Sequence, residues 1–94
     1  MQEPVKNYIE FDNGKTMVYV QSCDKDWANV GVFVNRGEIG KVKSAYYHIE
    51  IPGLKRNKYE QPKPGQLSHA EFDAVIELHK DEVVSLLEYL NSID

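Results

Sequence analysis

The sequence of 94 residues contains a single cysteine, Cys23, and no long hydrophobic run. One cysteine cannot form an internal disulfide, which fits a reducing compartment. No segment approaches the roughly 18 apolar residues of a membrane-spanning helix, and residues 1–6 lack the basic-then-apolar order of a signal peptide. We therefore expect a cytoplasmic protein that has no contact with a membrane.

Residue patterns that support catalysis are also missing. His48, His69 and His79 show no paired spacing typical of zinc ligands, and one thiol cannot complete the usual set. His79 and Glu82 stand three residues apart, but a histidine in a helical stripe is more often a core or interface residue than a ligand. The glycines fit turns better than a phosphate-binding loop. The sequence predicts a non-enzymatic protein with no metal and no cofactor.

A chain of this length supports one domain, residues 1–94, with one modest core. Two β-rich runs, Tyr8–Phe11 and Thr16–Ser22, flank Asn13-Gly14, which is a strong hairpin signal. Alternating apolar residues predict two further strands, one over Val30–Asn35 and one ending at Ile51. We expect an antiparallel sheet of about four strands.

Residues 68–93 are predicted to form one long C-terminal helix that packs on one face of the sheet, which makes the fold α+β. Ser68 and Glu71 form a capping-box pattern, and apolar residues recur at helical spacing from Phe72 to Leu90. A continuous helix would be about 36 Å long, against roughly 26 to 30 Å for a domain of this size. Either the chain breaks near His79, or the helix extends beyond the sheet and packs on another subunit. The absence of glycine and proline favours the extended helix.

Residues 52–66 contain three of the four prolines and two of the six glycines. We interpret this segment as a basic loop, with room for a short strand at 58–60.

The alternation divides the sheet into two faces. A valine-rich face with Tyr47 and Ile49 is expected to pack on the helix. The other face would carry an aromatic set where open sheets usually show Lys, Glu and Thr. This set comprises Tyr19, Phe33, Tyr46 and His48. It suits stacked nucleobases, and it suits equally a second core layer or a homodimer interface.

Basic residues concentrate in the middle of an otherwise acidic chain, with seven between Arg36 and Lys63 against three acidic residues. The uneven charge favours a binding surface. We expect single-stranded DNA or RNA as the partner. The candidate nucleic-acid-binding residues are Arg36, Lys41, Lys43, Tyr46, Lys55, Arg56, Lys58, Tyr59 and Lys63.

Two local motifs carry a family resemblance: the strand residues 47–51, and Lys63-Pro64-Gly65 followed by residues 67–72. Over residues 47–72 the chain resembles PC4-like single-stranded-DNA-binding domains. The resemblance implies a basic groove with Lys55, Arg56, Lys58 and Lys63, stacking by Tyr46 or Tyr59, and a dimer formed through helix and sheet. The chain departs from that family in having only residues 65–67 between the turn and the helix cap, where the family usually has a strand.

The acidic helix supports an alternative function. The protein would then be an inhibitor or accessory factor whose carboxylates occupy a basic surface of a nucleic-acid enzyme, as phage-type inhibitors present carboxylates in place of phosphates. The candidate partner-binding residues are Glu77, Asp81, Glu82 and Glu88. An ordinary solvated helix face explains the same charges.

Overall fold

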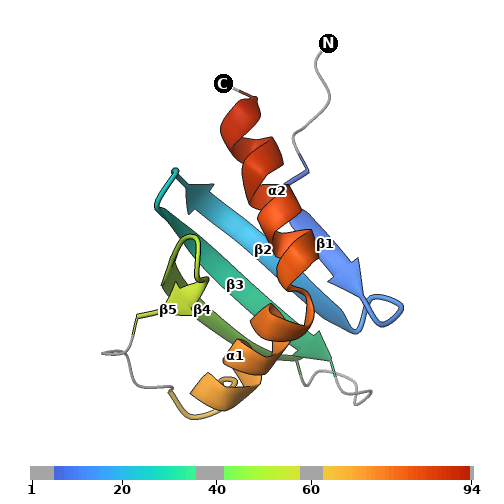
Figure 1. Ribbon diagram of the computed structural model, residues 1–94. Helices are drawn as coiled ribbons and strands as arrows, with labels where there is room; N and C mark the ends of the chain where they lie inside the picture. The colour runs from blue at the N-terminus through green and yellow to red at the C-terminus, as the bar shows by residue number, and fades with distance from the viewer. Residues whose placement is uncertain (1–5, 36–41, 58–62, 94) are drawn as a thin grey trace.

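The computed structural model describes residues 6–35, 42–57 and 63–93. It shows an α+β fold with one antiparallel sheet of five strands, in the order β1-β2-β3-β4-β5, and two helices on one face of that sheet (Figure 1). The strands are β1 (Tyr8–Phe11), β2 (Thr16–Cys23), β3 (Trp27–Asn35), β4 (Val42–Glu50) and β5 (Lys55–Arg56), and the helices are α1 (His69–Leu78) and α2 (Lys80–Ser92).

The predicted hairpin between β1 and β2 is confirmed, with its turn one residue earlier than Asn-Gly suggests. Asp12 and Asn13 have φ angles of 53° and 55°, and the N–H of Gly14 donates to the carbonyl of Phe11 at 3.1 Å. Two central residues with positive φ are what a type I′ turn requires. Gly14 also has a positive φ, 83°, and the N–H of Lys15 donates to the carbonyl of Asp12 at 3.1 Å.

The segment interpreted as a loop, 52–66, contains strand β5, which the sequence did not predict there. A tight turn after β4 brings Lys55 opposite Glu50 and Arg56 opposite Ile49. Two residues are too few to show alternation, so this strand has no sequence signature. The predicted strand at 58–60 lies outside the described residues.

The core lies between the sheet and the helices, on the face predicted to be valine-rich. Val18, Val32 and Ala45 lie opposite one another across β2, β3 and β4, and none is more than 2% exposed. The ring of Tyr47 meets Phe72 of α1 edge to face at 4.9 Å. Burial of these apolar side chains is the main force that holds helices and sheet together.

The prediction of one long helix extending beyond the sheet is wrong. The helix bends at His79, which has φ −110° and ψ 27°, and α2 starts without a side-chain cap. The His79 ring stacks on Phe11 of β1, with ring centroids 3.6 Å apart. The bend keeps both halves on the sheet, because α1 contacts β4 and β5 while α2 contacts β1 and β2 (Figure 1).

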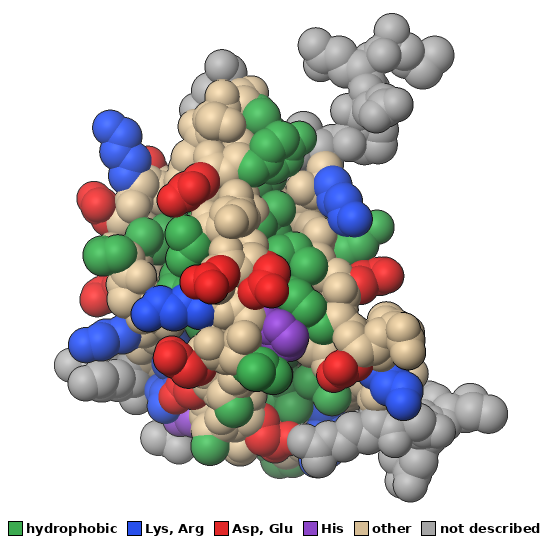
Figure 2. Space-filling view, turned by 45° about the vertical axis from the view of Figure 1, so that its right-hand side comes forward, with side chains coloured by type: hydrophobic (Ala, Val, Ile, Leu, Met, Phe, Trp, Pro, Cys, Tyr) green, Lys and Arg blue, Asp and Glu red, His purple; other side chains and the backbone are tan. Residues whose placement is uncertain are grey.

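Figure 2 shows acidic side chains gathered on the outer surface of the helices. Within the described parts of the chain, neither helix is long and apolar enough to cross a membrane.

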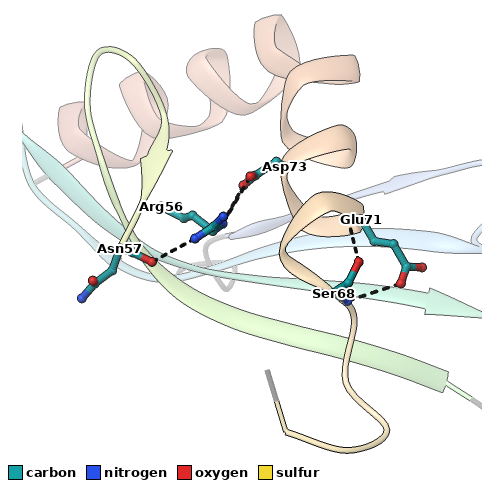
Figure 3. A network of polar contacts seen from close by, with 5 residues as sticks. All are labelled: Arg56, Asn57, Ser68, Glu71 and Asp73. Atoms are coloured by element: carbon teal, nitrogen blue, oxygen red, sulfur yellow. Dashed lines mark hydrogen bonds and ion pairs between the residues drawn. The ribbon is translucent and has the colours of Figure 1, made fainter. Parts of the chain in front are cut away.

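The capping box at the start of α1 generates a stability prediction. Ser68 Oγ accepts from the N–H of Glu71 at 3.1 Å, and Glu71 Oε1 accepts from the N–H of Ser68 at 3.3 Å (Figure 3). Replacing Ser68→Ala should lower the free energy of unfolding by about 1 kcal/mol in urea denaturation. Ser85→Ala, at an exposed position inside α2, is the control and should change the free energy of unfolding by less than about 0.5 kcal/mol. Equal effects would show that the cap contributes nothing specific.

Candidate functional site

The uncovered face of the sheet carries three tyrosines and one glycine aligned across four strands. Tyr8 lies opposite Tyr19, Tyr19 opposite Gly31, and Gly31 opposite Tyr46. Directly opposed residues point to the same face of an antiparallel sheet. We call this set the tyrosine row.

Because Gly31 has no side chain, the rings of Phe33 and Tyr46 can pack directly over its backbone. A Cβ atom at Gly31 would stand 3.2 Å from ring atoms of both Phe33 and Tyr46. Gly31 is itself buried although no helix covers this face, so the two rings shield its backbone. The arrangement resembles the way large aromatic side chains cover strand glycines in other sheets.

Tyr46 is the most open ring of the row, with 43% of the residue exposed. Partial burial raises the pKa of its phenol above the ordinary value of 10.0, and the nearby phenol of Tyr19 raises it further. Burial and the neighbouring phenol therefore disfavour ionisation of the Tyr46 hydroxyl. A neutral, donor-bearing aromatic surface suits a ligand with π faces and hydrogen-bond acceptors.

A second aromatic pair extends the face toward the other end of β3 and β4. Trp27 and His48 stack with ring centroids 5.5 Å apart and planes inclined by 23°. His48 Nδ1 contacts Asn29 Oδ1 at 2.9 Å, and Asn29 Nδ2 donates to Ser22 Oγ at 2.9 Å. Because an amide oxygen only accepts, the proton of this contact belongs to Nδ1 of His48. The chain of contacts holds the His48 ring against Trp27.

The predicted basic residues do not gather on this face. Lys43 lies opposite Val34, a residue that packs against the core, so Lys43 belongs to the helix side at the sheet's end. Lys55 lies opposite Glu50 of the uncovered face, at the sheet edge, and also borders a cavity of about 360 Å³ beside α1. Lys63 is exposed in the turn before α1. Arg36, Lys41, Lys58 and Tyr59 lie outside the described residues.

Arg56 has a structural role on the helix side. Its Nε lies 3.0 Å from Oδ1 and 3.2 Å from Oδ2 of Asp73 in α1, and Nη1 donates to the Asn57 carbonyl at 3.3 Å (Figure 3). The guanidinium also lies over the Tyr47 ring at 6.0 Å, within cation–π range. Arg56 joins β5 to α1 and faces away from the tyrosine row.

Sequence reasoning missed three members of the uncovered face: Tyr8, Trp27 and Asn29. The alternation of Tyr8 and Glu10 with Ile9 and Phe11 in β1 was a usable signal for the first of these. Trp27 and Asn29 continue the alternation of β3, but the predicted strand began at Val30 and left them out.

The four acidic candidates, Glu77, Asp81, Glu82 and Glu88, are all exposed on the helices. Asp81 and Glu82 border a groove between α2 and β1 (Figure 2). Among the described residues no group of three or more His, Cys, Asp or Glu side chains is placed to hold a metal ion.

Comparisons of the chain with protein-family models, curated proteins and solved structures find no match. The resemblance to PC4-like domains therefore stays a prediction from local sequence features.

The raised pKa of Tyr46 predicts its titration behaviour. In a phenolate-absorbance titration, Tyr46→Phe should remove a tyrosine that ionises above pH 10. Tyr19→Phe should lower the pKa of Tyr46 only in part, because burial is the larger cause of the shift. The folded state holds this proton more tightly than the unfolded state, so its contribution to stability is complete below pH 10 and is lost as pH rises through the raised pKa. Tyr46→Phe should accordingly lessen alkaline destabilisation. An unchanged titration curve would contradict the assignment.

The Arg56 contacts predict a contrast between two neighbouring basic residues. Arg56→Gln should lower the free energy of unfolding by about 1 kcal/mol, since its partly exposed ion pair and its packing are lost together. Lys55→Gln should change it by less than about 0.5 kcal/mol. A double-mutant cycle with Asp73→Asn measures the pair itself, and no coupling between the two sites would contradict the proposed bridge.

Proposed function

We propose that the protein binds single-stranded nucleic acid on the uncovered sheet face, without catalysing a reaction and without a cofactor. The observation that carries this proposal is the tyrosine row, aligned across four strands on a face that neither helix covers. Base stacking on aromatic rings contributes about 1 to 3 kcal/mol per base and needs little sequence preference. The proposed location is the cytoplasm.

Stacking, not phosphate contact, is the main source of affinity in this proposal. Two described lysines stand at opposite edges of the face. Lys6 has its ammonium 5.3 Å from the Tyr8 ring centroid, and Lys55 lies in β5. If these lysines neutralise two phosphates, the logarithm of the binding constant should fall with the logarithm of the salt concentration with a slope of about −1.4 for single strands. Arg56 does not contribute, because Asp73 already holds it on the other side of the sheet.

A homodimer is the competing use of the same face. The PC4-like resemblance implies a dimer through helix and sheet, and exposed aromatic sheet faces also serve as subunit interfaces. Dimerisation that buries Tyr46 would exclude nucleic acid from the row. The oligomeric state should therefore be measured with and without oligonucleotide, alongside the binding assay.

Fluorescence anisotropy of labelled single-stranded DNA and RNA, about 20 nucleotides long, measures the proposed binding. We expect micromolar affinity that Tyr46→Ala weakens by about tenfold or more, because one stacking contact is lost. Lys55→Glu should weaken binding less and flatten the salt dependence.

Tyr89→Ala is the matched control. Tyr89 has 48% of its residue exposed, close to the value for Tyr46, but it lies on α2 at the other layer. Equal losses for the two variants, or no binding at low salt, would refute the sheet-face proposal. A dimer in sedimentation that Tyr46→Ala dissociates, with no oligonucleotide binding, would assign the face to self-association.

A further inference from the structure

A groove of about 620 Å³ runs between the edge strand β1 and helix α2. Tyr8 and Ile9 line it from the strand, and Leu86 and Tyr89 line it from the helix. Tyr89 is one of the most exposed large hydrophobic residues described. Figure 2 shows hydrophobic side chains along this hollow with acidic side chains on the helix beside it. The groove thus has an apolar floor, with Asp81 and Glu82 on its helix side and Lys6 on its strand side.

Among the described residues no strand pairs with the outer edge of β1, which lies beside this groove. β1 is the first strand of the sheet and, within the described residues, pairs only with β2. The N–H of Val20 donates to the carbonyl of Asn7 at 2.8 Å, so Asn7 and Ile9 direct their backbone groups inward to β2. Alternation then turns the N–H and C=O groups of Tyr8 and Glu10 outward. An outward edge of this kind can accept another strand.

The charges around the groove specify which strand fits. Asp81 and Glu82 line its helix side, and Glu10 is exposed on the other face of β1, beside the same strand edge. Lys6 also lines the groove, with its ammonium 5.3 Å from the centroid of the Tyr8 ring. The three carboxylates outnumber this one ammonium, so a segment with positive charge gains from them, and its apolar side chains gain from contact with Ile9 and Leu86.

We propose that this groove binds an extended basic and apolar peptide segment of a partner protein, which adds as a strand to β1 beside α2. Apolar side chains at alternate positions would enter the groove, and the lysines or arginines between them would point to the other face, toward Glu10, while Asp81 and Glu82 attract the segment from the helix side. The proposal gives the acidic-helix alternative a defined site and a defined partner chemistry. It does not depend on nucleic-acid binding, which is centred on Tyr46 and Tyr19 of the uncovered face, although Tyr8 and Lys6 border both surfaces at the edge of the sheet.

A second copy of the chain fits the groove less well. It would bring another set of the same carboxylates to the same place, and like charges repel. A peptide of opposite charge avoids this cost.

The test uses the full chain and a short fluorescein-labelled peptide in which lysine alternates with valine, with a glutamate–valine peptide as the charge-reversed probe. We expect micromolar binding of the first peptide and none of the second. Tyr89→Ala should weaken binding by about tenfold. Glu10→Pro removes an outward N–H and should weaken binding more than Glu10→Ala, which removes only the carboxylate.

Tyr46→Ala is the control here and should leave peptide affinity unchanged, the reverse of its expected effect on oligonucleotide binding. Thermal unfolding checks that Glu10→Pro retains the fold. If this variant unfolds, Tyr89→Ala still tests the proposal, because Tyr89 is exposed and its replacement leaves the core intact. Absence of lysine–valine binding, equal binding of both peptides, or indifference to Tyr89→Ala would overturn the proposal. A dimer that Tyr89→Ala dissociates would overturn it in favour of a second copy.

Discussion

The register of β3 against its two neighbours is the constraint on which the rest of the structure depends. Val32 lies opposite Val18 and Ala45, so these three side chains all enter the core under the helices. The adjacent residue, Gly31, lies opposite Tyr19 and Tyr46 on the uncovered side. A shift by one residue would expose the valines and bury the tyrosines. Burial of the valine face therefore fixes the composition of the candidate site, although no core residue belongs to it.

Alternation also separates residues that are neighbours in the sequence. Tyr46 and Tyr47 point to opposite faces, one 43% exposed and the other 3%. Lys55 lies opposite Glu50, while Arg56 lies opposite Ile49 and forms an ion pair with Asp73 of α1. A basic stretch counted along the chain is thus divided between two layers. The uncovered face is more aromatic and less basic than the linear charge distribution suggests, which shifts the expected affinity from phosphate contact toward stacking.

The parts of the fold that were predictable are those with a local, repeated signal. Alternation identified four strands and both faces, and the Ser68–Glu71 capping box identified the start of α1. Helix length left a break near His79 as one of two alternatives, but the choice between them was not predictable, because the ring of His79 stacks on Phe11, more than sixty residues earlier in the chain. β5 has two residues and no periodicity of its own. For the candidate site, Tyr46 could be assigned to the uncovered face, whereas the placement of Arg56 depends on a strand pairing and a helix position that no local pattern encodes.

The central claim is that the tyrosine row contacts single-stranded nucleic acid. Two-dimensional NMR of the aromatic side chains tests it most directly, since Tyr46 and Tyr47 are adjacent in sequence and lie on opposite faces. On addition of an oligothymidine or oligouridine strand, the account predicts shifts of the ring signals of Tyr46, Phe33 and Tyr19, with those of Tyr47 and Phe72 unchanged. Shifts confined to Tyr89 and other helix-side rings, or no shifts at saturating oligonucleotide, would contradict it.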